Sequence, residues 1–406
     1  MRILVLSYET PSYPGGGGQT RQHCLLEPLA TRHQIRVLST GAPPKLGRPP
    51  DGVELRYIRP LPPLPPPSGR WLRKNLDHYL SGPPWLHRLA LHESSALEVV
   101  LAEHLADFRP DIVQIEHGEL APLLRAVPAG LPTVLVMHNM LTTIQRQLVG
   151  LQTTARERLA MRLEVTVMAR QERRDLRAAG AVIVTTKHDR RLALRLQPRA
   201  RVSIVPNCIP VDHFRRDAGR APVPTVVMTA SFQYPPNQAA AHHLLADIFP
   251  RVREAVPDAE LVLVGQGMQR RLRAEVHACP GARATGAVAD VRPELHRAWV
   301  SVAPLWEGSG SPLKVLEALA SRVPVVVASR VAAALEMDAD QGVVSAGGAG
   351  DFAARVIELL RDPERGERLA TAGLAVVRER FDRLPAAAAH EAVWESLAGR
   401  GGNRAA

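Results

Sequence analysis

The stretch Val302–Ala328, VAPLWEGSGSPLKVLEALASRVPVVVA, is the most informative part of the chain. A short apolar strand leads into a glycine and serine turn over 308–311. A helix is predicted to begin there, with Ser311 as its N-cap and Pro312 at its first position. A second apolar run over 324–328 follows the helix. This strand–turn–helix–strand order is typical of a parallel sheet covered by helices.

The predicted helix start is a site for phosphate, because its unpaired N–H groups and positive dipole end point outward. Lys314, one turn into the helix, adds a mobile positive charge. Glu317 follows three residues later on the same side and can accept two hydroxyl hydrogen bonds. Phosphate groups beside a diol acceptor describe a nucleotide diphosphate and its ribose.

The segment resembles the donor-nucleotide motif of family-4 retaining glycosyltransferases with the GT-B fold, G-x-G-[ST]-x-[LP]-K-V-L-E-A-[ML]-A followed by P-V-V. The resemblance implies that Glu317 holds the ribose and that Lys314 faces the diphosphate as a catalytic residue. It implies a donor-binding role for the residues around them: Gly308, Ser309, Gly310, Ser311, Pro312 and Leu313. Many members carry a sugar-contacting glutamate at the position of Ser309, so Glu307 is the candidate for that contact. The alternative is an ordinary Rossmann-type helix start with a solvated lysine and glutamate.

Further motifs of the second half resemble the same family. Gly265 lies in a V-G-x-G turn, and Gly286 with Val288 resembles the segment whose backbone reads the nucleotide base. Residues 231–237 resemble the turn where many members place Arg and Lys against the diphosphate, and this chain has neither there. The resemblance therefore implies that Lys314 and backbone amides take more of that role.

Four glycines, Gly15, Gly16, Gly17 and Gly18, separate the first predicted strand from the first predicted helix, which Gln19 opens. Glycines let the backbone approach a ligand closely. The resemblance implies an acceptor and phosphate loop here, because family-4 enzymes place a P-x-x-G-G loop at this point. The alternative is a flexible connection.

His138 and Asn139 end the predicted strand over 133–138. A histidine at a strand end can orient a donor sugar or stabilise charge. The family's strand-end H-[DN] makes His138 a catalytic candidate and places Asn139 in the acceptor and phosphate loop. A structural histidine is the alternative.

The composition limits partners and compartment. Formal net charge is +11, yet the arginines are dispersed and no aromatic residues interleave with them, so we expect no nucleic-acid partner. Three scattered cysteines favour a reducing cytosol. No apolar run approaches the ~20 residues of a membrane helix. Peripheral membrane contact stays open, because residues 71–85 mix two tryptophans, a tyrosine and basic residues.

Short β-branched runs alternate with helical patterns in both halves of the 406-residue chain. This predicts an α/β protein with two Rossmann-like parallel-sheet domains facing a cleft. The predicted divisions are an acceptor-side domain over 1–210, a linker over 211–224, a nucleotide-sugar domain over 225–384 and a final helix with a tail over 385–406. The resemblance implies the GT-B fold, in which that helix crosses back to the first domain.

We therefore expect a retaining glycosyltransferase that moves a sugar from a nucleotide diphosphate donor to a hydroxyl acceptor. The nucleotide sugar is a co-substrate, and no cofactor or metal is expected, since Asp338-Ala339-Asp340 follows no strand. An inverting transferase or a sugar-nucleotide epimerase remains an alternative, with His23 the imidazole nearest the first loop. A non-catalytic relative is another. Glycan, lipid-linked and secondary-metabolite acceptors all remain open.

Overall fold

The computed structural model describes residues 1–44, 47–58, 94–150, 154–216, 219–307 and 311–401. The chain divides into two compact units. Unit 1 comprises Met1–Pro206 and Ala387–Ala406, and unit 2 comprises Asn207–Ala386. The predicted linker over 211–224 lies in unit 2 and contains a 3-10 helix, η2 (Val211–Phe214). The segment over 71–85 and Gly308, Ser309 and Gly310 lie outside the described residues.

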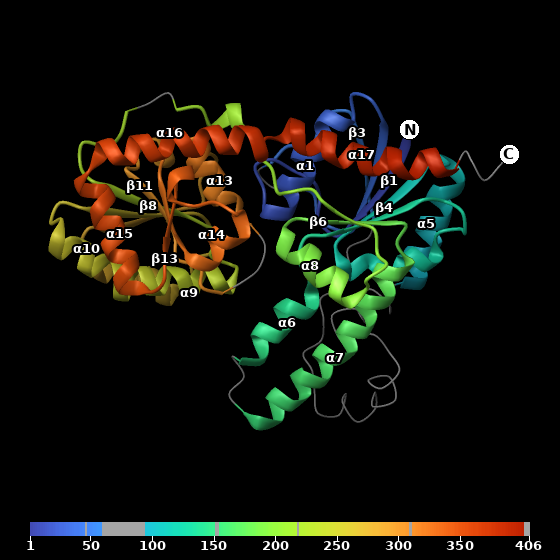
Figure 1. Cartoon of the computed structure of the whole chain (residues 1–406), viewed down its shortest axis with the longest axis horizontal. Coiled ribbons are helices and arrows are strands. Elements are labelled where there is room, and N and C mark those ends of the chain that lie inside the picture. The colour runs from blue at the N-terminus through green and yellow to red at the C-terminus, as the bar shows by residue number, and fades with distance from the viewer. Residues whose placement is uncertain (45–46, 59–93, 151–153, 217–218, 308–310, 402–406) are drawn as a thin grey trace. The chain divides into compact units, whose positions relative to one another are not determined.

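Unit 1 is built on a seven-stranded parallel sheet with the order β3-β2-β1-β4-β5-β6-β7 (Figure 1). The chain adds strands outward from β1 in one direction and then returns to β1 to add β4 on its other side. The strands are β1 (Arg2–Ser7), β2 (Gln34–Ser39), β3 (Val53–Tyr57), β4 (Ile112–Glu116), β5 (Thr133–Met137), β6 (Ala181–Val184) and β7 (Val202–Ile204).

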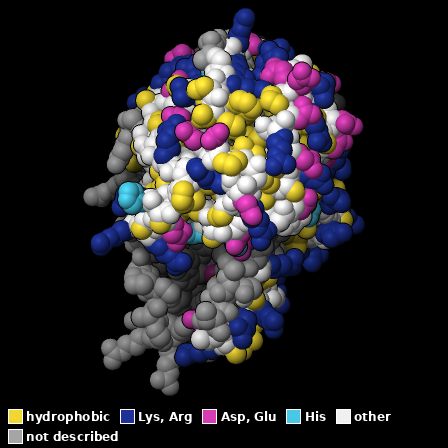
Figure 2. All heavy atoms as spheres, turned by 90° about the vertical axis from the view of Figure 1, so that its left-hand side faces the viewer, with side chains coloured by type: hydrophobic (Ala, Val, Ile, Leu, Met, Phe, Trp, Pro, Cys, Tyr) yellow, Lys and Arg dark blue, Asp and Glu magenta, His cyan; other side chains and the backbone are white. Residues whose placement is uncertain are grey.

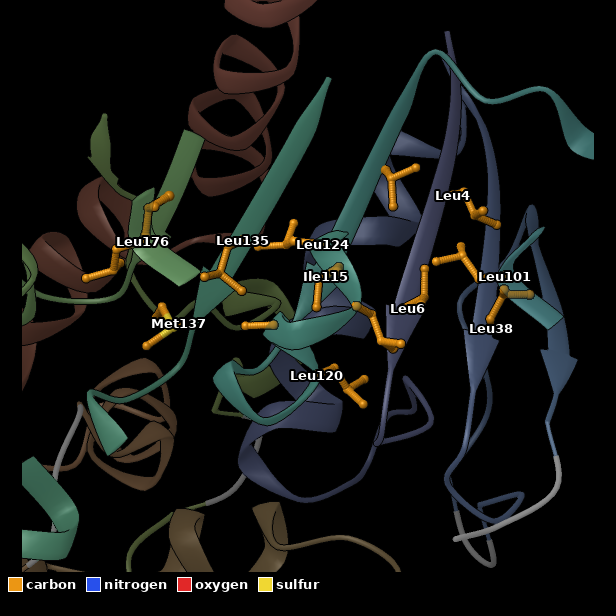
Figure 3. Packing of buried hydrophobic residues seen from close by; sticks show 14 of the residues in the cluster. Leu4, Leu6, Leu38, Leu101, Ile115, Leu120, Leu124, Leu135, Met137 and Leu176 are labelled. Atoms are coloured by element: carbon orange, nitrogen blue, oxygen red, sulfur yellow. The ribbon is translucent and has the colours of Figure 1, made fainter. Parts of the chain in front are cut away.

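Buried aliphatic side chains fill one face of this sheet (Figure 3). Side chains alternate between faces along a strand, so Leu4 and Leu6 of β1 point to the same side as Ile115 of β4. The elements that cover this face include α5 (Ser94–Phe108), η1 (Gly118–Ala126), α7 (Ala155–Ala178) and α8 (Lys187–Leu196).

The opposite face of the same sheet receives α17 (Arg383–Gly401), whose Trp394 contacts Gln114 of β4. The remaining α-helices in the described part of unit 1 are α1 (Gly17–Leu29) and α6 (Leu141–Gly150), and α6 pairs with α7 as a helical hairpin. α17 begins in unit 2, and from Ala387 on its residues belong to unit 1.

Unit 2 is built on a six-stranded parallel sheet with the order β10-β9-β8-β11-β12-β13, which reverses in the same way. Its strands are β8 (Thr225–Thr229), β9 (Glu260–Val264), β10 (Ala282–Gly286), β11 (Val300–Ala303), β12 (Val325–Ala328) and β13 (Val343–Ala346). Its helices include α9 (Pro235–His243), α10 (Phe249–Ala255), α11 (Arg270–Ala278), α12 (Arg292–Arg297), α13 (Leu313–Ala320), α14 (Ser329–Leu335), α15 (Ala349–Arg361) and α16 (Pro363–Arg380). The predicted fold class of two Rossmann-like parallel-sheet units is confirmed.

Among the α-helices that the structure describes, three were not predicted from the sequence: α6, α8 and α14. α8, with the sequence KHDRRLALRL, is polar throughout its first half and carries apolar residues only in its second half. Its start is marked instead by Thr186, which follows β6 and accepts a hydrogen bond from the backbone N–H of Asp189. Such an N-cap was readable in the sequence, because Thr and Asp three residues apart are typical of a helix start.

Candidate functional site

The reversal of strand order in unit 2 places the carboxyl ends of β8 and β11 at the point where parallel sheets bind ligands. β8 leads into the N-terminus of α9, and β11 leads through residues 304–312 into α13. The segment that resembles the donor motif therefore lies next to the strand-order switch of its own sheet.

One side chain from each of these two helices joins them. Lys314 of α13 donates from Nζ to Oδ1 of Asn237 on α9 over 2.8 Å. Nδ2 of Asn237 in turn donates to the carbonyl of Ser231, just after β8, over 2.8 Å. Asn237 thus fixes the position of the Lys314 ammonium, a role that was not predicted from the sequence.

Lys314 and Glu317 are half-buried neighbours on α13. Burial lowers the pKa of Lys314 to about 8, and the nearby Glu317 carboxylate opposes this shift. Burial raises the pKa of Glu317 to about 7, and Lys314 opposes that shift. Both shifts arise because the charged forms lose water, so a ligand that supplies a phosphate to one side chain and hydroxyls to the other would stabilise the charged pair.

The predicted cap of α13 was wrong by one residue. Pro312 is the N-cap and α13 begins at Leu313, because Pro312 has an extended ψ of 124°. Ser311 accepts a hydrogen bond at its carbonyl from Nδ2 of Asn207 over 2.8 Å. Its buried hydroxyl has no hydrogen-bond partner among the described residues. A ligand oxygen beside this hydroxyl would satisfy it.

Gly265 and Gly286 lie on the other side of β8, where β9 and β10 end. The Gly265 N–H donates to the Gly286 carbonyl over 3.0 Å. Gly265 has a φ of +138°, and a Cβ there would lie 1.8 Å from the Ala230 carbonyl oxygen, so only glycine fits. Val288 follows in the half-buried turn after β10. Glu307 is exposed, and its carbonyl accepts from Nη2 of Arg330 over 3.0 Å.

Unit 1 collects titratable side chains at its own switch, between the carboxyl ends of β1 and β4. His138, after β5, contacts Oε2 of Glu116 through Nε2 over 2.6 Å. The His138 ring stacks on His117 with centroids 4.0 Å apart. Burial lowers the pKa of both imidazoles well below the ordinary value, and each lies near a further positive group. Both are therefore neutral at neutral pH.

Glu9, which follows β1, belongs to this cluster and was missed in the sequence analysis. Its Oε2 lies 3.7 Å from Nε2 of His117 and has no hydrogen-bond partner among the described residues. Burial, followed by the carboxylates of Glu119 and Glu116, raises the pKa of Glu9 to about 7. The available signal was its place at the end of the first strand, where a Rossmann-like sheet binds ligands.

The four-glycine segment is not all loop. Gly16 is the N-cap of α1, its N–H donates to Oε1 of Gln19 over 2.8 Å, and Gly17 and Gly18 are already helical. A Cβ on Gly18 would lie 2.1 Å from Oε2 of Glu9, so this glycine lets the helix start against the carboxylate. Asn139 lies half-buried next to His138.

Two family models together match most of the chain. Residues 16–208 match the profile of the glycosyl transferase 4-like domain, and residues 223–362 match the profile of glycosyl transferases group 1. This chain belongs to the group 1 glycosyltransferases. The curated protein sequences contain no significant match.

Solved structures support the GT-B architecture of this glycosyltransferase. Sucrose-phosphate synthase from Thermosynechococcus elongatus matches with a TM-score of 0.71 at 15% identity, over 98% of this chain and 99% of its own. Trehalose 6-phosphate synthase from Burkholderia multivorans matches with a TM-score of 0.65 at 14% identity, over 98% of this chain and 99% of its own. The Anabaena protein HepE in complex with UDP-glucose matches with a TM-score of 0.63 at 13% identity, over 97% of this chain and 99% of its own. At these identities the likeness concerns the fold. No helix in the described part of the glycosyltransferase combines the length and apolarity of a membrane span.

The raised pKa of Glu9 predicts a pH-dependent penalty on stability. The folded chain binds this proton more tightly than the unfolded chain does, so its contribution to stability is lost as pH rises from about 4.5 to about 7. Glu9→Gln is therefore expected to match the wild type at pH 4 and to exceed its free energy of unfolding at pH 8, by up to about 3 kcal/mol. Urea unfolding at both pH values measures this. Glu379→Gln, at an exposed position, is the control, and equal gains for the two variants would contradict the assignment.

Proposed function

We propose that this glycosyltransferase moves a sugar from a nucleotide diphosphate donor to a hydroxyl acceptor with retention of anomeric configuration. The observation that carries the proposal is the Lys314–Glu317 pair at the strand-order switch of unit 2, with Lys314 held by Asn237. One cation for a diphosphate and one carboxylate for a diol, three residues apart on one helix, match the two polar parts of such a donor.

Lys314 would act on the leaving group. As the bond between sugar and diphosphate breaks, negative charge grows on the diphosphate, and an ammonium already oriented by Asn237 stabilises that charge without reorganising. The proximity of the phosphate would also oppose the loss of the Lys314 proton, because an opposite charge favours the charged form. The Anabaena neighbour solved with UDP-glucose supports the same donor class.

Retention requires no protein nucleophile in the mechanism that we propose. The acceptor hydroxyl attacks the anomeric carbon on the face from which the diphosphate leaves, and the departing phosphate oxygen takes the hydroxyl proton. The protein then contributes positioning and charge stabilisation. We assign His138 to orienting the donor sugar, because it is neutral at neutral pH and its ring is held by Glu116 and His117. No metal or cofactor takes part in this mechanism.

The stereochemistry of the product tests this proposal. An assay with an α-linked nucleotide sugar in excess EDTA is expected to give an α-linked product, identified by the anomeric proton coupling in NMR. The donor is found by screening UDP-, GDP- and dTDP-sugars for thermal stabilisation, since a ligand at 100 times its Kd adds ~2.7 kcal/mol. A β-linked product would refute retention, and loss of turnover in EDTA that Mn²⁺ restores would refute metal independence.

Glu317→Gln tests the ribose contact. The substitution keeps the shape of the side chain and removes charge-assisted hydrogen bonds worth ~1.5–3 kcal/mol each. The Kd for the nucleoside diphosphate is expected to rise at least about tenfold by calorimetry. Glu254→Gln, an exposed glutamate of the same unit, is the matched control. If both variants bind like the wild type, Glu317 does not hold the ribose.

An inverting transferase is the second candidate, and Glu9 is the observation that favours it. An inverting enzyme needs a base for the acceptor hydroxyl, and a carboxyl with a pKa of about 7 is suited to that task. His23, the base considered from the sequence, is buried and lies 3.5 Å from Glu27. Glu9 with His117 is the better placed pair. The anomer assay separates the two candidates, because only inversion yields the β product from an α donor.

We also propose that unit 1 contacts an anionic membrane surface through α7. Leu159 and Leu163 are 61% and 57% exposed, one helical turn apart. Six exposed arginines lie along the same helix: Arg156, Arg162, Arg170, Arg173, Arg174 and Arg177. Figure 1 shows the α6–α7 hairpin extending away from the sheet of unit 1, and Figure 2 shows basic side chains beside hydrophobic ones at that lower end. Leucine beside arginine on one helix face favours an anionic bilayer on the cytoplasmic side.

Vesicle sedimentation tests this contact. The wild type is expected to sediment with phosphatidylglycerol vesicles and to stay in solution with phosphatidylcholine vesicles. The double variant Leu159→Ser with Leu163→Ser is expected to lose most of this binding. Leu384→Ser, which changes a leucine that is 60% exposed in unit 2, should bind as the wild type does. Equal binding by all three proteins would refute the role of α7.

A further inference from the structure

A glutamine lies fully buried in the middle of the sheet of unit 1. Gln114 occupies the third position of β4, and its side chain points to the face that α17 covers. A buried amide must find partners for both its oxygen and its nitrogen, because an unsatisfied polar group in a dry core costs ~1–3 kcal/mol. Both the oxygen and the nitrogen of the Gln114 amide have hydrogen-bond partners, which come from different elements.

The oxygen end belongs to α17. Nε1 of Trp394 donates to Oε1 of Gln114 over 2.8 Å. Nε2 of His390, one helical turn earlier, approaches the same oxygen at 2.8 Å. Both side chains are fully buried. An indole N–H can only donate, so the oxygen of the amide must face α17 and the amide cannot be turned over.

The nitrogen end therefore faces along β4. Nε2 of Gln114 donates to Oε1 of Glu116 over 2.6 Å, which is possible because residues two apart on a strand share a face. The other oxygen of Glu116, Oε2, lies 2.6 Å from Nε2 of His138. The chain of contacts thus runs from α17 through Gln114 and Glu116 to His138, and all of it lies in unit 1.

The direction of each hydrogen bond follows from the first. The Glu116 carboxylate can only accept, so Nε2 of His138, which approaches its Oε2, carries the proton and Nδ1 does not. The amide N–H of Gln114 on Oε1 holds the carboxylate in the position that presents Oε2 to His138. The amide oxygen of Gln114 likewise determines which ring nitrogen of His390 carries the proton. Its Nε2 donates to Gln114, and its buried Nδ1 has no hydrogen-bond partner among the described residues. Burial lowers the pKa of His390 to about 3, so that ring stays neutral.

We propose that Gln114, held by Trp394 and His390 of α17, is a positioning residue that sets the tautomer and ring orientation of His138. The effect that we expect on turnover rests on the proposed role of His138 at the donor sugar. The tautomer itself is a property of unit 1. The contact gives α17 a task beyond packing, because its indole and imidazole determine which nitrogen of His138 is left to accept a hydrogen bond from a substrate hydroxyl.

The test is the nitrogen NMR spectrum of the His138 ring, since protonated and unprotonated imidazole nitrogens have separate chemical shifts. The wild type is expected to show the Nε2–H form alone. Gln114→Met removes the amide and keeps its length, so Glu116 loses the donor that holds it, and His138 is expected to become a mixture of both tautomers. The turnover number is expected to fall about tenfold or more, while nucleoside diphosphate affinity stays unchanged.

Conservative variants separate positioning from packing. Gln114→Glu can still donate to Glu116 while its carboxyl is protonated, so its turnover is expected to approach the wild type at low pH and to decline as pH rises. Trp394→Phe loses one donor to Gln114 and should shift the tautomer in the same direction as Gln114→Met. Trp299→Phe is the matched control, because it removes an indole hydrogen bond of 2.9 Å to the carbonyl of Ala221 in unit 2.

The outcomes are distinct even where a variant folds poorly. If Gln114→Met does not fold, the His138 tautomer is compared between Trp394→Phe and its control Trp299→Phe instead. A pure Nε2–H tautomer of His138 in every folded variant would overturn the inference, as would a Gln114→Glu pH profile parallel to that of the wild type. A shifted tautomer with unchanged turnover would uphold the positioning and instead refute the proposed role of His138 at the sugar.

Discussion

Parallel strands end at one edge of a sheet, and in both units the order of strands reverses once along that edge. This constraint brings together side chains that are distant in sequence. In unit 1 it gathers Glu9, Glu116 and His138 from the ends of β1, β4 and β5. In unit 2 it gathers Asn237 and Lys314 from the helices that follow β8 and β11. A point of reversal leaves room between diverging helices, so polar groups there can meet a ligand.

Desolvation then sets the chemistry of these groups. The imidazoles of His117 and His138 are neutral because burial disfavours their charged forms. Glu9 and Glu317 hold their protons to about pH 7 for the same reason. The two units differ in the neighbouring charges that act on these buried groups. In unit 2 the opposite charges of Lys314 and Glu317 support one another, whereas in unit 1 Glu9 faces other carboxylates. Such groups are poised to respond to a ligand's charge.

Alternating β-branched runs and helical patterns are enough to predict two parallel sheets from the sequence. α8 was missed because its first half is polar and its apolar residues lie only in its second half. The start of α13 was predicted one residue early, because Ser311 is a good cap by type but Pro312 has the extended backbone. Gly17 and Gly18 were predicted as loop, since glycine is a weak helix former, although both lie in the first turn of α1, where Gly18 is close to Glu9.

Local sequence patterns are enough to predict the fold class, the family resemblance and the Lys314–Glu317 spacing, because these depend on residues close together along the chain. Only the tertiary structure decided that Asn237 orients Lys314, that Glu9 lies against His117, and that α17 reaches Gln114. Those contacts join residues as far apart as positions 114 and 394. No local pattern encodes such a pair, since it forms only when a sheet and the helix that covers it are both in place. A lone buried glutamine in an apolar strand is nevertheless a signal that a distant donor must exist, because its amide has to be satisfied.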